Sequence, residues 1–422
     1  MSNDTKTTTV TTPPPAVDPR LLQRGSGLSG YVDEFVRKVR GGDIGSLPVI
    51  VGLAIIWLVF SLDDGKYFTA STAEFIAYYM VGIGLLSMGL VFVLLLGEID
   101  LSVGSVSGLA AAVYAVLSVN HHVNPWLSVL LTLLTGAAIG SLHGWVFAKI
   151  GVPAFVVTLA GFLAWQGVML WLLGNSGTIN LDDKGLNHFL SGNSYFLGGD
   201  ISGGYLLALL GVLSLLAGSF VEQARRRKAG VPFRPTGEIV LRAGLLAIGA
   251  FGAAYVLNRA SGVPNALVVF VALLITCDFV LRRTRFGRKI FAVGGNIEAS
   301  RRAGISVPAI RISVYAISGT FAALGGLAIA ATTNAAGQAG ADPNNLILSI
   351  AAAVIGGTSL FGGRGRVWSA FLGVLVIESI NAGLYMLGLT LDIQYMITGG
   401  VLLAAVVVDS LARRTQKSSG RG

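Results

Sequence analysis

Charged residues are scarce in this chain. Asp, Glu, Lys and Arg make up 12% of its 422 residues, whereas hydrophobic residues make up 53%. Soluble domains carry roughly 25% charged residues. Because so few charged side chains cannot cover the surface of a water-soluble protein, the composition indicates a polytopic membrane protein.

The chain also has little that could carry covalent or metal chemistry. Its one cysteine, Cys277, excludes an intramolecular disulfide, and we expect it to be a small packed side chain within an apolar run. The sequence has no Gly-x-x-x-x-Gly-Lys-Ser/Thr phosphate-binding loop and no readable Ser/His/Asp or Cys/His arrangement. We therefore expect no catalytic residue, no metal site and no cofactor in this chain.

Apolar stretches long enough to cross or nearly cross a bilayer recur from residue 47 onward. They lie near 47–62, 75–96, 103–119, 126–148, 154–173, 204–221, 243–258, 266–281, 312–332, 346–360, 367–388 and 394–409. We predict an all-α, polytopic membrane helical bundle of about 10–12 transmembrane segments, because several stretches are shorter than the ~20 residues of a full crossing. The segments 103–119 and 346–360 are the first candidates for broken or re-entrant helices.

Polar segments flank the predicted transmembrane domain, which covers residues 47–410. Residues 1–46 form a tail that reads as disordered over 1–20, followed by either a short amphipathic helix on the membrane surface or a solvated linker. Residues 411–422 form a basic tail. We expect both tails to lie in the cytoplasm.

The distribution of Lys and Arg predicts this orientation. If the N-terminus is inside and the spans alternate, the inner loops and tails contain 27 of the 30 basic residues, and only Lys66, Lys184 and Arg259 lie outside. Such an asymmetry follows the positive-inside rule. Because the basic residues gather on one side of the membrane, the membrane explains the formal net charge of +9. We therefore expect a lipid bilayer and no nucleic acid as a partner.

Small residues recur at helical spacing in two predicted spans. Gly136, Gly140 and Gly144 lie on one helical face, as do Gly104 and Gly108. Faces of small residues let helix backbones approach closely within lipid. We interpret them as packing surfaces of a compact bundle.

Polar side chains within or beside the spans are candidates for a translocation path or a helix break. They are Glu98, Asp100, Ser102, Thr158, Gln166, Glu378 and Asn381. An intramembrane carboxylate is by default a functional-site hypothesis, and Glu378 lies in the middle of a predicted span. Each has a structural alternative. Glu98 and Asp100 can equally stabilise the first turn of the next helix, and Glu378 can form a hydrogen bond between helices, whereas helix packing is the favoured interpretation for Thr158 and Gln166.

The longest inner loop, residues 282–311, contains eight basic residues and a predicted short helix over 298–302, which Gly304 can end. A charged helix on this face can receive force from a separate ATPase. The alternative is that its arginines only set the topology and bind lipid headgroups.

Three segments resemble successive signatures of one family. They are GEIDLSVGSV (97–106), FGRKIFAVGGNIEASRRAGI (286–305) and SIAAAVIGGTSLFGGRGRVWSAFLGVLVIESINAGL (349–383). Together with residues 152–167, they resemble the ribose/galactose/xylose permeases of ATP-binding-cassette (ABC) importers over most of the chain beyond about residue 75. The added length, at the N-terminal tail and over 174–258, is similar to the D-xylose branch.

The resemblance implies a function and a set of partners. The chain is expected to be the permease subunit that moves a monosaccharide into the cytoplasm by alternating access across a bacterial inner membrane. The expected sugar is D-xylose, and the alternative is another pentose or a hexose. The expected partners are a sugar ABC ATPase subunit, which binds ATP and Mg, a periplasmic sugar-binding protein and a second copy of this chain in a homodimer.

The resemblance also implies which residues couple transport to the ATPase. The family's coupling loop matches here at Phe286, Gly287, Gly294, Gly295, Asn296, Glu298, Ala299 and Gly304. ABC importers in general share the pattern Glu-Ala-Ala-x-x-x-Gly in this loop. The sequence departs from it, because Ser300 replaces the second alanine and the Ile-x-Leu-Pro that usually follows is absent. The rival hypothesis is an ion-coupled secondary sugar transporter, in which Glu378 or Asp100 would bind the coupling proton or sodium ion.

Overall fold

The computed structural model describes residues 47–64, 67–181, 185–192, 195–196, 201–231, 233–390, 392–401, 403–404 and 407. Over this part of the chain the fold is mostly helical, and nine helices are long and apolar enough to cross a membrane. The predicted surface helix within 1–46 and the basic tail at 411–422 lie outside the described residues.

The long helices follow the predicted apolar stretches. They are α2 (Leu47–Asp64), α3 (Ala70–Leu95), α4 (Val103–Ala115), α5 (Pro125–Trp145), α6 (Ala154–Leu173), α8 (Gly203–Lys228), α9 (Thr236–Asn258), α10 (Asn265–Arg283), α13 (Val307–Thr333), α14 (Pro343–Ile355) and α15 (Trp368–Met386). Residues 392–401 are also helical. Shorter helices are α7 (Leu186–Ser191), α11 (Arg285–Gly295) and α12 (Ile297–Arg302).

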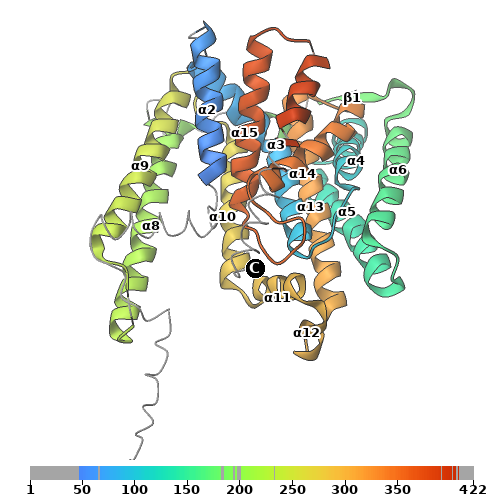
Figure 1. Cartoon of the computed structure of the whole chain (residues 1–422). Helices are drawn as coiled ribbons and strands as arrows, with labels where there is room; N and C mark the ends of the chain where they lie inside the picture. The colour runs from blue at the N-terminus through green and yellow to red at the C-terminus, as the bar shows by residue number, and fades with distance from the viewer. Residues whose placement is uncertain are drawn as a thin grey trace, which may run out of the picture.

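Helices α3 and α13 form the centre of the bundle. Helix α3 is buried along most of its length, and α13 packs against α3, α4 and α5. The hairpin of α8 and α9 stands at one side of the bundle and α6 at the other (Figure 1). Both hairpin helices are mostly exposed, as expected of helices that face lipid.

The glycine faces lie where backbones meet. A Cβ atom on Gly140 of α5 would stand 2.0 Å from the carbonyl oxygen of Tyr315 in α13, and one on Gly136 would stand 2.3 Å from that of Gly319. On α4, Gly108 faces Ala341 in the same way. The predicted packing role of these glycines is confirmed.

The two segments expected to be irregular differ from each other. Residues Val103–Asn120 form one unbroken helix, whose last five residues, Val116–Asn120, have π geometry. Helix α14 has 13 residues. It is therefore about 20 Å long, shorter than the ~30 Å hydrocarbon core of a bilayer, and 356–367 continue without regular structure.

Two short antiparallel strand pairs add to the predicted helices. Strand β1 (Thr178–Asn180) pairs with β4 (Ala335–Gly337), and β2 (Tyr195–Phe196) pairs with β3 (Ile201–Ser202). Helices α11 and α12 and the α8–α9 turn lie at the end of the molecule opposite β1, at the bottom of Figure 1. We call this the basic end, because it contains Arg225–Lys228 and most of the arginines between 282 and 302.

Candidate functional site

A cavity of about 560 Å³ opens among α3, α13, α14, α15 and the helical residues 392–401. Most of its walls come from the ends of these helices that lie away from the basic end (Figure 1). Its polar or aromatic lining residues are Phe75, Tyr79, Thr332, Thr333, Asn344, Asn345, Glu378, Asn381, Tyr385, Gln394, Tyr395 and Thr398. Small-molecule sites are commonly cavities of roughly 300–1,000 Å³ with a few polar groups among apolar ones.

Glu378 is the one charged side chain among the described residues that line this cavity. Its side chain is 5% exposed. The hydrogen bond that it accepts from Asn381 Nδ2, one turn along α15, is 3.4 Å long. Both members of this pair are among the sequence candidates for the path.

The side of α15 that faces away from the cavity is held by hydrogen bonds. Trp57 Nε1 of α2 donates to Ser379 Oγ at 3.0 Å, and the Tyr67 hydroxyl donates to the Ser379 carbonyl at 2.7 Å. Since Ser379 follows Glu378 directly, these bonds fix the rotation of α15 that presents the carboxylate to the cavity.

Three aromatic rings line the wall of the cavity that α3 and α15 form. The Phe75 ring lies 4.4 Å from the Tyr79 ring and 5.8 Å from the Tyr385 ring, with which it is stacked. On the α14 side, Asn344 Nδ2 donates to the Tyr395 hydroxyl at 3.1 Å. The cavity thus combines a carboxylate, amides, hydroxyls and flat apolar rings.

Asp100 and Ser102 lie elsewhere, in a buried polar network between helices. Asp100 Oδ1 accepts from the Ser102 backbone N–H at 3.0 Å and from Ser102 Oγ at 2.6 Å, and Oδ2 accepts from Ser318 Oγ of α13 at 2.8 Å. His143 Nδ1 lies 3.2 Å from Ser102 Oγ, and Trp165 Nε1 donates to His143 Nε2 at 2.9 Å. His143 is thus a buried packing residue that links the Asp100–Ser102 segment to Trp165 of α6.

Glu98 lies between α3 and α4, near the basic end, and pairs with Arg311 of α13 at 3.1 Å. Burial raises the pKa of the Glu98 carboxyl, and the Arg311 guanidinium partly opposes this shift. Arg311 also lies over the Phe147 ring, 4.2 Å from its centroid. Glu98 and Asp100 thus join the segment before α4 to two points on α13.

The other two candidates on the sequence list do not reach the cavity. Thr158 Oγ1 of α6 is buried and donates to the carbonyl of Ala154 in its own helix at 3.0 Å. Gln166 lies on the same helix, outside the cavity lining. Of the seven path candidates, Glu378 and Asn381 line this cavity.

Helices α11 and α12 lie at the basic end, where α11 crosses below the bundle (Figure 1). Thr284 Oγ1 accepts the Gly287 N–H at 3.2 Å at the start of α11, and Asn296 Oδ1 accepts the Ala299 N–H at 2.9 Å at the start of α12. Gly304, with φ +77°, ends this segment. The short helix predicted at 298–302 and its glycine stop are confirmed.

The residues expected to couple to an ATPase fall into two groups. Gly287 and Gly294 pack closely, since a Cβ atom on them would stand 2.1 Å from the Leu281 carbonyl oxygen and 1.8 Å from that of Leu95. Phe286 is half-buried. The exposed members are Gly295, Asn296, Glu298, Ala299 and Gly304.

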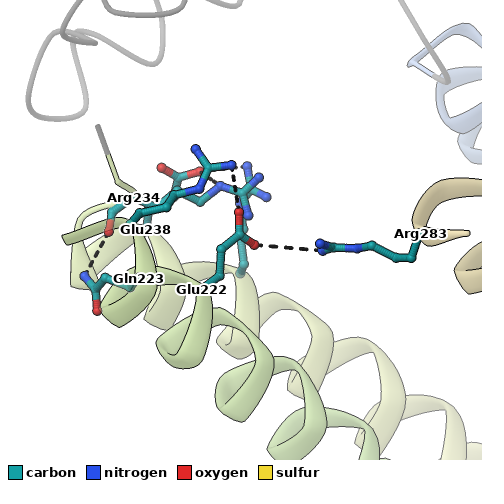
Figure 2. Close-up of polar contacts among 7 residues, drawn as sticks. Glu222, Gln223, Arg234, Glu238 and Arg283 are labelled. Carbon is teal, nitrogen blue, oxygen red and sulfur yellow. Dashed lines mark hydrogen bonds and ion pairs between the residues drawn. The ribbon is translucent and has the colours of Figure 1, made fainter. Parts of the chain in front are cut away.

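Ion pairs form at the basic ends of α8, α9 and α10. Glu222 of α8 pairs with Arg226 at 2.9 Å and with Arg283 of α10 at 4.0 Å (Figure 2). Glu238 of α9, whose side chain is 3% exposed, pairs with Arg242 at 2.7 Å. Among these pairs, Glu222–Arg283 joins the hairpin to α10, and none of them involves the cavity.

Sequence reasoning missed most of the cavity. Phe75, Tyr79, Asn344 and Tyr395 lie near the ends of spans, and no local pattern separates such residues from those that anchor helices at the interface. Among the described residues no group of three or more His, Cys, Asp or Glu side chains could hold a metal ion.

Comparisons with known proteins match the chain along nearly its whole length. A family model described as "Branched-chain amino acid transport system / permease component" matches residues 72–406. The xylose transport system permease protein of Escherichia coli K12 is 35% identical over 367 residues, which cover 87% of this chain and 92% of that protein. No solved structure matches the chain.

Two further relatives have similar coverage. The xylose transport system permease protein of Haemophilus influenzae is 34% identical over 86% of this chain and 95% of its own length. The ribose import permease protein of Escherichia coli K12 is 30% identical over 86% of this chain and 92% of its own length.

Proposed function

This chain belongs to the family of branched-chain amino acid transport system / permease components, and from that premise we propose that it carries D-xylose as the permease subunit of an ABC sugar importer. The resemblance to sugar-type permeases is confirmed by these relatives. The chain is a multi-pass membrane protein and a permease rather than an ATPase. ATP and Mg are bound by the partner subunit, and this chain contributes the passage.

The observation that carries the choice of D-xylose is the match to xylose permeases over 86–87% of the chain. The ribose permease also has a pentose as cargo, but at 30% identity it is less similar to this chain than the xylose permeases are. Import by this subunit requires a sugar-binding protein on the outer side and an ATPase on the inner side.

We propose that the basic end is cytoplasmic and that α12 is the surface that the ATPase contacts. The excess of Lys and Arg supports the orientation. Exposed Glu298 and Ala299 lie on a short helix that the four residues 303–306 connect directly to the central helix α13. Movement of α12 can therefore reach the interior of the bundle as a movement of α13.

We propose further that Glu378 and Asn381 lie on the translocation path and that two copies of this chain form it together. The cavity among α3, α14 and α15 supports this assignment, because a buried carboxylate lines it and most of its walls lie toward the end opposite α12. Alternating access between that end and the basic end would then move the sugar inward.

The test uses the complete complex, with its ATPase and binding protein, in proteoliposomes. We expect D-xylose uptake that requires ATP hydrolysis. Replacing Glu298 by Arg should lower sugar-stimulated ATP hydrolysis by at least about tenfold, the effect of losing a central interface contact, while leaving membrane insertion intact. Glu222→Arg, a charge reversal at the basic end of α8, is the matched control and should keep full coupling.

Two results would contradict the proposal. Uptake that is driven by a pH or sodium gradient without the ATPase would establish the ion-coupled transporter instead. Full coupling in Glu298→Arg would remove α12 from the contact with the ATPase.

A further inference from the structure

Glu378 is a buried carboxylate with too few partners. It is 5% exposed, and the hydrogen bond that it accepts among the described residues is the 3.4 Å contact from Asn381. An ionised carboxylate can accept about four hydrogen bonds, and burying a charge without such bonds is costly. The carboxylate lines the cavity, so a bound molecule with hydrogen-bond donors can supply the missing bonds.

The groups around Glu378 indicate what kind of molecule fits. Amide side chains of Asn344, Asn381 and Gln394 each offer both donors and acceptors, as the hydroxyl groups of a sugar do. The rings of Phe75, Tyr79 and Tyr385 offer flat apolar surface for the C–H face of a pyranose. A bare cation could interact with the negative π faces of these rings but would gain nothing from their apolar surface.

The position of the cavity fits a step early in transport. Its lining includes the first half of α3, the last residues of α13, the length of α14 and the second half of α15, and most of these segments lie toward the end away from α11 and α12. A molecule released at the end opposite the basic end would meet this cavity before it reached α12.

We propose that this cavity is a monosaccharide-binding site within the permease, in which Glu378 accepts hydrogen bonds from adjacent sugar hydroxyls and the aromatic wall contacts the ring. This inference rests on the proposed function for the identity of the sugar. The site holds the sugar weakly after the binding protein releases it, since a tight site would slow passage. Glu378 is therefore a residue that selects polyhydroxylated cargo, and Asn381 orients its carboxylate.

The test is binding of D-xylose to the full chain in lipid nanodiscs, without ATPase or binding protein. Saturation-transfer NMR detects millimolar binding and reports which sugar protons lie near aromatic rings. We expect transfer to the ring C–H protons of D-xylose. Glu378→Gln keeps the size of the side chain but removes the charge, and should weaken binding by about tenfold or more, as for loss of a charge-assisted hydrogen bond.

Matched controls separate the site from a loss of folding. Asn381→Ala should also weaken binding, whereas Asn258→Ala, a buried amide in α9, and Glu222→Gln should leave it unchanged. Thermal melting of each variant shows whether the bundle is intact. An unchanged affinity in Glu378→Gln, no transfer in the wild-type chain, or displacement of the signal by sodium but not by other sugars would each overturn the proposal.

Failure of this site and failure of the proposed function give different results. If the complete complex imports D-xylose with ATP and Glu378→Gln imports it equally well, the binding site is wrong and the importer stands. If the wild-type complex imports no sugar although the nanodisc sample binds D-xylose, the site stands and the importer is wrong.

Discussion

The buried carboxylates of Asp100 and Glu378 differ in the number of hydrogen-bond donors that they meet. Asp100 accepts three hydrogen bonds, from two groups of Ser102 and from Ser318. Glu378 accepts one long bond from Asn381 and faces a cavity. A satisfied buried charge fixes the structure around it, whereas an unsatisfied one can bind a ligand. We therefore propose that Asp100 serves helix packing and that Glu378 serves transport.

The packing role of Asp100 leads to a prediction at Ser318. Replacing Ser318 by Ala removes the hydroxyl that bonds to Asp100 Oδ2 and joins α13 to the segment before α4. Loss of a hydrogen bond to a charged group should cost about 1.5–3 kcal/mol of stability. The measurement is the apparent melting temperature of the purified chain in detergent.

Ser313→Ala is the matched control for this substitution. Ser313 lies on the same helix, and its hydroxyl bonds only to the backbone of its own helix, at Ala309, on an exposed face. Its loss should change stability by about 0.5 kcal/mol or less. Equal melting temperatures for the two variants would show that the Asp100 network does not hold the helices together.

Glycine has two different roles among the helices. Gly140 lies against the backbone of α13, whereas a Cβ atom on Gly249 of α9 would meet nothing within 4 Å. The first glycine permits two helices to touch, and the second only adds backbone freedom. An added methyl group would therefore disturb helix packing at Gly140 of α5 but not at Gly249 of α9.

We predict opposite effects for alanine at these two positions. Gly140→Ala should separate α5 from α13 and destabilise the chain by about 1–3 kcal/mol, the usual cost of overpacking. Gly249→Ala should leave stability unchanged or raise it by up to about 1 kcal/mol, because alanine favours the helix. Melting temperatures of the two purified variants test this. A stable Gly140→Ala chain would show that α5 and α13 are not in close contact.

Most of the fold follows from the sequence at the scale of the whole molecule. Hydrophobic length predicts every long helix, because a span must satisfy its backbone within lipid. The short helix α12 and its glycine stop follow from charge and turn chemistry.

The cavity could not be predicted to the same degree. Glu378 and Asn381 are conspicuous as polar residues inside a span, but the other cavity residues come from other segments, and Tyr79 lies 299 residues before Glu378. Which faces of these helices meet is set by long-range packing. For the same reason Asp100, equally conspicuous in the sequence, could not be told from a path residue until its donors were seen.

The orientation of the whole molecule gives the last prediction. In a Cys277→Ala background, a single cysteine replaces either Ala299 on α12 or His121 at the opposite end, both of which are exposed. If the basic end is cytoplasmic, a membrane-impermeant maleimide should label His121→Cys in intact cells, once the outer membrane is opened, and should not label Ala299→Cys. Inverted membrane vesicles should reverse the pattern, because the inner face is then accessible. Labelling of Ala299→Cys from outside would place α12 beyond the reach of any ATPase and remove the basis of the importer mechanism.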